Sequence, residues 1–260
     1  MRRLFRTKQL QSSVEFLRKP LAVQMTDVHC HCLANMDDGP VGMDSSIGIC
    51  QALVADGINK VVASPHQLGR YENNTADDIR SAVNHLNKKL KELKIDLEVL
   101  PGADVRVDER LVQMLEDDLI MTVADRGKYI LLELPHEAFV DISIIVNQLQ
   151  DKGITSVITH PERHLTLATK PGLMDKWVEN GSILQITAGS LLGDFGESAK
   201  KAGWFFLQNY ENIIVAGDVH DIRRRSPRMR EAFSEISLRI GQNKAIEFCA
   251  SKPLEIITEV

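Results

Sequence analysis

Several features are scarce in this chain of 260 residues, and each scarcity excludes a class of protein. Only four residues are cysteine, and the nearest pair, Cys30 and Cys32, is too close to bridge comfortably. A disulfide framework is therefore excluded, and reduced, buried thiols of a cytoplasmic protein are expected. No segment has the length or apolar purity of a membrane-spanning helix. The net charge of −5 argues against general nucleic-acid binding.

Residues 1–24 form a basic segment ahead of the first predicted strand. It begins MRRLFRTK, but Gln, Ser, Glu and Lys interrupt it before an apolar core can develop, so we expect no secretion signal. We interpret the segment as a basic N-terminal extension, either a short arm or a frayed end. A single domain is expected over residues 25–260.

From residue 25 onward, short β-branched runs alternate with helical patterns. Seven strands are predicted, at 25–32, 59–64, 97–100, 129–133, 156–159, 182–187 and 212–216. Predicted helices cover 45–55, 76–93, 109–115, 140–149, 173–179 and 197–208, and further helices follow residue 227. Crossovers of this length return the chain in the same direction, so the strands are expected to be parallel. The fold class is therefore α/β, either an open doubly wound sheet or a closed barrel.

The first strand carries two histidines, His29 and His31, one residue apart. Alternate side chains of a strand point to the same face, so the two imidazoles project together. Neutral imidazole is a common metal ligand, although a pair of hydrogen-bonded core histidines would give the same pattern.

Further histidines and carboxylates follow the ends of the other strands. In a β/α barrel these ends converge on one rim, where active sites are built. Six of the seven strands supply such a residue, which favours a distorted, TIM-like (β/α)₇ barrel with one metal site. The candidate ligands are His29, His31, Asp38, His66, Asp104, Glu133, His160, Asp218 and His220.

The candidate ligands are too many for one ion. They indicate two or three divalent cations bridged by carboxylate, an arrangement that suits phosphoryl hydrolysis. Three histidines stay outside the set. His85 is expected on a helix surface, whereas His136 and His164 are left open as supports of the ligands or as loop residues.

Seven segments, in order, resemble the polymerase-and-histidinol-phosphatase superfamily, and within it the bacterial protein-tyrosine phosphatases of capsule and exopolysaccharide loci. They are DVHCH at 27–31, DDGP at 37–40, ASPH at 63–66, PGAD at 101–104, LE at 132–133, THPER at 159–163 and GDVH at 217–220. The resemblance implies a (β/α)₇ barrel with a three-metal centre, usually of manganese, iron or zinc, and ligand roles for the matching histidines and carboxylates. It also implies that Arg163 and Arg225 bind phosphate.

The substrate implied by the resemblance is phosphotyrosine on the tail of a membrane-associated bacterial tyrosine kinase, in the control of capsular or extracellular polysaccharide synthesis. His66 and Asp218 are the candidates to protonate the leaving group. One position departs from the pattern, because Asp104 stands where close relatives carry a bridging glutamate. Aspartate is one methylene shorter, so Asp104 is expected to reach less far, and the occupancy of a third metal site is left open. A homo-oligomer is also left open.

Arg225 lies in a basic run, in which Ser226 and Pro227 predict the start of a helix. Cations at a helix start are mildly unfavourable, and a bound anion would relieve the conflict. A guanidinium matches phosphate oxygens bidentately, which supports Arg225 as a phosphate ligand.

Three other functions are alternatives to a metal-dependent tyrosine phosphatase. A thiol-based phosphatase requires Arg six residues after its nucleophilic Cys, and those positions here hold Met36, Asp38, Asp56 and Glu255. That route is excluded. A small-molecule phosphatase of histidinol-phosphate type, and a non-catalytic metal-binding regulator of the kinase, remain as alternatives.

Overall fold

The computed structural model describes residues 23–259, so residues 1–22 of the predicted N-terminal extension lie outside the described part. Nine strands within this range form two parallel sheets, one in the order β1-β2-β4 and the other in the order β3-β5-β6-β7-β8-β9. The predicted α/β fold with parallel strands is confirmed. The strands are β1 Met25–Cys30, β2 Ile58–Ala63, β3 His66–Gln67, β4 Glu98–Pro101, β5 Asp104–Arg106, β6 Tyr129–Glu133, β7 Thr155–Thr159, β8 Ile183–Thr187 and β9 Ile213–Ala216.

Two short strands that were not predicted, β3 and β5, follow the second and third predicted strands. Strand β3 comes after Pro65, and β5 comes after Pro101 and Gly102. Pro65, which has no N–H for a sheet ladder, lies between β2 and β3. Gly102 is needed because a Cβ there would lie 2.4 Å from Cγ1 of Val62. Backbone bonding continues past these prolines, since Asp104 N–H donates to the Pro65 carbonyl at 3.1 Å.

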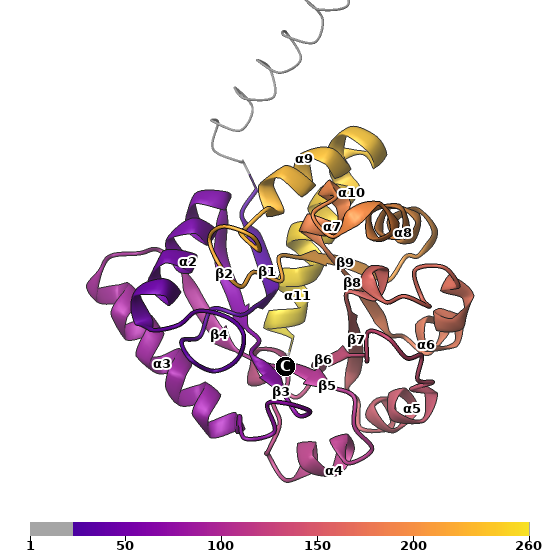
Figure 1. The fold of residues 1–260 in the computed structure, drawn as a ribbon, viewed down its shortest axis with the longest axis horizontal. Coiled ribbons are helices and arrows are strands. Elements are labelled where there is room, and N and C mark those ends of the chain that lie inside the picture. Colours follow the sequence, from indigo (N-terminus) through magenta and orange to yellow (C-terminus); the bar gives the residue numbers. More distant parts are fainter. Residues whose placement is uncertain (1–22, 260) are drawn as a thin grey trace, which may run out of the picture.

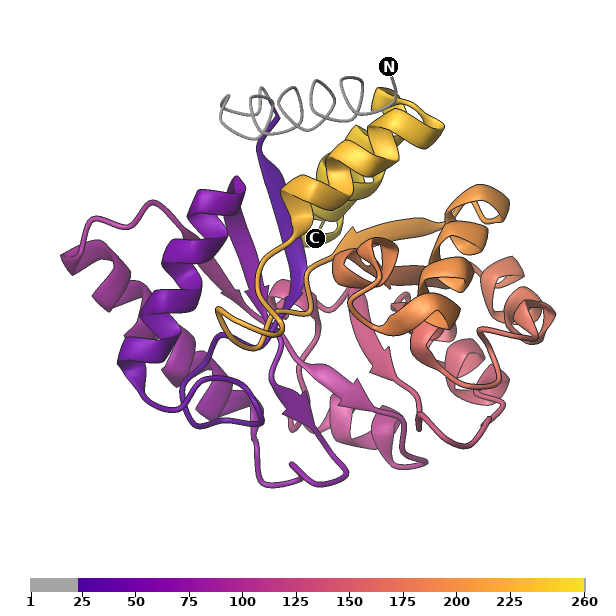
Figure 2. The same ribbon diagram turned by 45° about the horizontal axis from the view of Figure 1, so that its top comes forward.

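The ends of the first and last strands lie against each other. The N–H of Asp218 donates to the His29 carbonyl and that of His31 to the Val219 carbonyl, both at 2.8 Å. Gly217 N–H donates to Asp27 Oδ1 at 2.9 Å. Figure 2 shows the loop after β9 passing close to the loop after β1. The candidate ligands His29 and Asp218 are thus held side by side although they lie nearly 190 positions apart.

Helices surround the strands in Figure 1. They are α2 Met43–Asp56, α3 Ala76–Glu92, α4 Leu111–Glu116, α5 Ser143–Asp151, α6 Asp175–Glu179, α7 Ala188–Leu192, α8 Gly196–Asn209, α9 Met229–Ile240, α10 Gln242–Ile246 and α11 Lys252–Thr258. Short 3₁₀ turns occupy Val123–Asp125, Pro161–Arg163 and Pro171–Met174, and one π-helical turn occupies Glu247–Ser251.

Helix α3 illustrates why the longer helices are predictable. Thr75 and Asp78 form a capping box at its start, and Ile79, Val83 and Leu86 continue a buried apolar stripe at helical spacing. Each such aliphatic side chain contributes about 1.5–3 kcal/mol on burial.

Some helix starts differ from the prediction. Helix α5 begins at Ser143 rather than 140, because the Asp141 carboxylate accepts the Ser143 N–H and holds the preceding residues in a turn. Helix α9 begins at Met229, so the predicted cap at Ser226 and Pro227 is wrong. Helix α7 was not predicted.

A small apolar cluster fills the space between the strands. Val28, Val62, Leu131, Val157 and Ile214 each come from a different strand and are fully buried. Two isoleucines of α11 complete this cluster. The polar residues gather at the carboxyl ends of the strands instead.

Candidate metal centre

All nine predicted ligands lie at the carboxyl ends of β1, β2, β4, β6, β7 and β9 or in the residues that follow them. They come from β1, β3, β5 and β6 and from the segments that follow β1, β7 and β9. His29, His31 and Asp104 are fully buried, while the Asp38 side chain is 52% exposed. The structure therefore brings together residues that span 29–220 in one cluster.

His29 and His31 share a face, as predicted, and their Nε2 atoms lie 3.1 Å apart. The opposite nitrogen of each ring is engaged, since His29 Nδ1 lies 2.8 Å from Gln185 Oε1 and His31 Nδ1 lies 2.5 Å from Asp37 Oδ2. These acceptors favour a proton on Nδ1 and leave a lone pair on each Nε2. Two lone pairs that face each other are stabilised by a cation between or beside them.

Asp37 is a site residue that the sequence analysis missed. Its Oδ2 also accepts the His66 N–H at 3.0 Å, and its Oδ1 accepts the Gly39 N–H at 2.9 Å. Burial alone would raise the pKa of Asp37, but the contact with His31 outweighs it and lowers the pKa to about 2. Burial lowers the pKa of His31 to about 3, so this imidazole is neutral, as a metal ligand must be.

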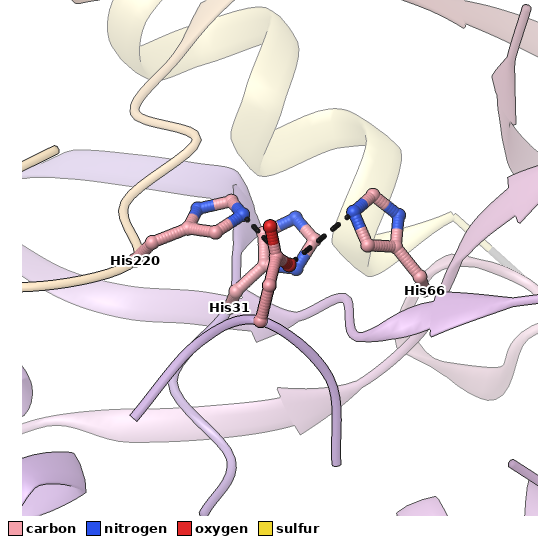
Figure 3. Close-up of side chains that lie close together, drawn as sticks. His31, His66 and His220 are labelled. Atoms are coloured by element: carbon pink, nitrogen blue, oxygen red, sulfur yellow. Dashed lines mark ion pairs between the residues drawn. The ribbon is translucent and has the colours of Figure 1, made fainter. Parts of the chain in front are cut away.

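Ligand atoms gather in three overlapping groups, each within 4.8 Å. The groups are His31, Asp38, His66 and His220; His29, His31 and Asp104; and His66, Asp104 and Glu133. Figure 3 shows the rings of His66 and His220 on either side of His31. His160 and Asp218 belong to none of these groups, but they border them: His160 Nε2 lies 3.9 Å from Asp104 Oδ2, and Asp218 Oδ1 lies 3.4 Å from His29 Nε2.

Unsatisfied polar atoms test whether these residues suit a metal. Asp104 Oδ2, Asp218 Oδ1, His66 Nδ1 and His220 Nε2 are buried, and none makes a hydrogen bond within residues 23–259. Such an atom costs roughly 1–3 kcal/mol unless a partner satisfies it. All four belong to candidate ligands and can bind a divalent cation. The residues present therefore fit a centre for more than one metal ion.

Asp104 lies where two of the groups meet, yet it offers them one oxygen. Its Oδ2 is 3.5 Å from His29 Nε2 and 3.4 Å from His66 Nδ1, whereas its Oδ1 accepts the hydroxyl of Thr159 at 3.1 Å. The partner of Glu133 is Arg106, at 3.1 Å. Burial raises the pKa of Glu133, and the nearby Asp104 adds to the effect.

Two arginines form ion pairs with the candidate ligand Asp218. The Nη2 atoms of Arg163 and Arg225 lie 2.6 Å and 2.5 Å from the same oxygen, Oδ2. Burial would raise the pKa of Asp218, but Arg163 and His29 outweigh it and hold that pKa well below its usual value. The Arg163 guanidinium lies over the ring of Phe195 at 4.6 Å. Two cations are thus positioned beside the candidate metal ligands.

Two candidate ligands have left-handed backbone conformations, with φ of 37° at His160 and 51° at Asp218. Residues with a Cβ are uncommon in this region, and each costs of order 1–3 kcal/mol. The hydrogen bond from Asp218 N–H to β1 holds the second of these. Strain of this kind clusters at functional sites.

The three remaining histidines have separate places. His85 is exposed on α3, as predicted. His164 is buried, and its Nδ1 accepts the N–H groups of Thr166 and Leu167, so it supports a loop. The His136 ring lies 5.5 Å from that of His160 and lines the cavity beside the cluster.

Two cavities open from the cluster. One of about 690 Å³ is lined by Asp38, His66, Glu133, Arg106 and Tyr71, among others. The second, of about 430 Å³, is lined by Arg163, Arg225 and Phe195 and includes His136, which also lines the first. The two cavities are therefore neighbours: Asp38, His66 and Glu133 line the first, and the two arginines line the second.

Known proteins are similar to this chain over most of its length. The chain is 36% identical over 221 residues to the tyrosine-protein phosphatase YwqE of Bacillus subtilis, which covers 84% of this chain and 85% of YwqE. It is 26% identical over 241 residues to the tyrosine-protein phosphatase CpsB of Streptococcus pneumoniae, covering 90% and 99% of the two chains.

A solved structure from work on YwqE and CpsB, described as unique metal-dependent tyrosine phosphatases, superposes with a TM-score of 0.86 at 32% identity. The match covers 90% of this chain and 94% of that one. The resemblance predicted from the seven segments is confirmed. A family model described as "Capsular polysaccharide synthesis, CpsB/CapC" matches residues 25–258, and this chain therefore belongs to the CpsB/CapC family.

Proposed function

We propose that this protein is a metal-dependent tyrosine-protein phosphatase that acts in capsular or extracellular polysaccharide synthesis. Its substrate is phosphotyrosine on the tail of a bacterial tyrosine kinase. The observation that carries the proposal is the pair of guanidiniums on Asp218, beside the groups of histidines and carboxylates that could hold metal ions. The names of the relatives point to the same activity.

The nine candidate ligands would hold two or three divalent cations, of manganese, iron or zinc. Bound cations supply hydroxide at neutral pH by lowering the pKa of water, and they neutralise phosphoryl oxygens. Asp37 and Gln185 orient His31 and His29 toward this centre. Because one oxygen of Asp104 is held by Thr159, Asp104 contributes a single oxygen to the centre.

Arg163 and Arg225 bind the non-bridging oxygens of the phosphoryl group. A guanidinium offers several N–H donors, so each can keep its contact with Asp218 while it donates to the substrate. Both donate to Asp218 Oδ2, which leaves that oxygen poorly placed to give a proton to the leaving group. Of the two predicted proton donors, His66 is therefore the better candidate.

The rim position of the site suits a distorted (β/α)₇ barrel, which we propose as the architecture of residues 25–260. If β2 and β3 count as one strand, and β4 and β5 as another, the barrel has seven strands. The backbone bonds from β1 to the segment after β9 support closure, and the bond from Asp104 to Pro65 links the second and third strands beyond their prolines.

A chelation experiment tests the proposed chemistry. We expect a strong chelator to abolish hydrolysis of an aryl phosphate, and divalent metal to restore it. Thiol alkylation should largely spare the activity, because all four cysteines are buried and burial raises the pKa of Cys30 to about 11. The opposite pattern would end this mechanism.

Substrate class requires a separate comparison. A small-molecule phosphatase of histidinol-phosphate type would use the same metal ligands, so turnover of a phosphotyrosyl peptide must be measured against histidinol phosphate. A non-catalytic regulator would bind the kinase without hydrolysing either compound, and its binding would survive Asp218→Ala. We expect the peptide to be the better substrate.

The cysteines bear on the cellular location of the proposed enzyme. The four free cysteines support a cytoplasmic location. No helix among residues 23–259 is long and apolar enough to cross a bilayer.

A further inference from the structure

A groove leads away from the candidate metal centre along helix α8. The cavity beside Arg163 and Arg225 shares Ala168 and Ser198 with a third hollow, also of about 430 Å³. That hollow is further lined by Thr169, Pro171, Lys201, Ala202 and Phe205. Shared lining residues make the hollows neighbours, so a chain in the first can continue into the second.

One face of α8 forms a wall of this groove. Ser198, Ala202 and Phe205 follow one another at four and three residues, which places them on one side of a helix. From Phe195 to Phe205 the helix rises about 15 Å at about 1.5 Å per residue. Four or five residues of an extended peptide, at about 3.3 Å each, cover that length.

The chemistry of the groove changes along its length. The inner end holds the two arginines that we assign to the phosphoryl group. The middle is lined by the small residues Ala168 and Ser198, and Leu165, which lines the inner cavity, is 67% exposed. At the outer end Lys201 is exposed, and no ion pair to it is found among residues 23–259.

We propose that this groove, lined by residues 163–171 and by α8, binds the extended segment of a protein substrate that adjoins its phosphotyrosine. Small or apolar residues of the substrate lie beside Ala168 and Ser198, and an acidic residue four or five positions from the phosphotyrosine pairs with Lys201. The inference rests on the proposed phosphatase function and names its substrate class as an acidic, extended peptide. A small phosphate ester would leave the groove empty.

The groove has a direct kinetic test. Phosphotyrosyl peptides are made with Glu or Ala four and five positions from the phosphotyrosine, on its N-terminal side in one set and its C-terminal side in another. The quantity measured is kcat/KM for each peptide divided by kcat/KM for p-nitrophenyl phosphate, which reaches the centre without using the groove. This ratio separates groove binding from the chemistry.

For one of the two sets, we expect the Glu peptide to be preferred over the Ala peptide by about three- to tenfold, the range of an exposed ion pair with added steering. Lys201→Glu should abolish or invert this preference, mainly through KM. Ser198→Trp, which fills the middle of the groove, should lower the ratio for both peptides by at least about fivefold, because the shared wall of the two hollows is blocked. Lys88→Glu makes the same charge change on exposed α3 and should leave every ratio as in the wild type.

Two results would overturn the groove while leaving the phosphatase intact. One is a ratio that neither Lys201→Glu nor Ser198→Trp alters. The other is an equal effect of Lys88→Glu, which would reduce the Lys201 effect to net charge. If Ser198→Trp does not fold, the exposed Lys201→Glu decides alone. Failure of the wild type to hydrolyse any aryl phosphate would instead refute the proposed function, and the groove with it.

Discussion

Replacement of Asp37 by Asn tests how the centre is organised without removing a candidate ligand. Asp37 is buried and makes three contacts, to His31 Nδ1 at 2.5 Å and to the N–H groups of His66 and Gly39 at 3.0 and 2.9 Å. Asn keeps one oxygen but places an NH₂ group where the second oxygen accepted hydrogen bonds. At least one donor among these partners therefore loses its acceptor.

The expected loss follows from the role of Asp37 as the partner of a ligand. Removing a carboxylate that orients a metal-binding histidine typically lowers metal affinity about 10- to 100-fold, which is roughly 1.4–2.7 kcal/mol. The metal-free protein should also be less stable, by about 1–3 kcal/mol, because a buried donor is left unpaired. Calorimetric titration of chelator-stripped protein with Mn²⁺ measures the first effect, and denaturant unfolding the second.

Asp44→Asn provides the matched control. Asp44 is exposed in the first turn of α2, so the same chemical change should alter stability by only a few tenths of a kcal/mol through the helix dipole, at the low end of the usual 0.3–1. Metal affinity in this variant should equal that of the wild type. If Asp37→Asn also bound Mn²⁺ with wild-type affinity, Asp37 would not set the orientation of His31, and this reasoning would be refuted.

Three further substitutions have expected outcomes. Burial raises the pKa of Asp56 to about 6, from 3.8, so the folded state holds a proton that the unfolded state has lost between about pH 4 and 6. The stability that protonated Asp56 contributes is therefore full below pH 4 and is lost as the pH rises to 6. Asp56→Asn should be more stable than the wild type by up to about 3 kcal/mol at pH 7, with little difference near pH 4. Equal differences in stability at both pH values would contradict the raised pKa of Asp56. Gly48→Ala should raise stability by about 0.5–1 kcal/mol in denaturant unfolding, because Gly48 lies inside α2 and an added Cβ meets nothing within 4 Å among the described residues; a loss of stability would show that the site is crowded. Gly217→Ala should lower stability by about 1–3 kcal/mol, because its Cβ would lie 2.4 Å from Asp27 Oδ2. The same variant should bind Mn²⁺ more weakly, because Gly217 adjoins the candidate ligand Asp218. An unchanged melting temperature and an unchanged Mn²⁺ affinity would count against a tight junction of β1 with β9.

The sequence allowed the α/β order and the convergence of ligands to be predicted because both depend on local patterns. The period-two spacing of His29 and His31 places both rings on one face, and strand ends are where parallel strands deliver side chains. Helix α3 was predictable from its capping box and apolar stripe. These signals lie within a few residues of one another.

Features that depend on loop conformation or distant contacts could not be predicted in the same way. Asp37 and Asp38 are adjacent carboxylates, and only the fold shows that Asp37 turns toward His31 while Asp38 faces His220. The short strand β3 after Pro65 depends on its pairing with β5. Gln185, which orients His29, lies 156 residues away in a strand for which no site residue was predicted.

The most direct test of the central claim is an anomalous difference map from crystals of the full chain grown with excess Mn²⁺. The account predicts two or three strong peaks at the carboxyl ends of the strands, each contacted by imidazole nitrogens or carboxylate oxygens of the nine candidate ligands. The peak nearest Asp104 should contact its Oδ2 alone. A map without peaks among these residues, or with manganese bound only elsewhere on the protein, would contradict the account.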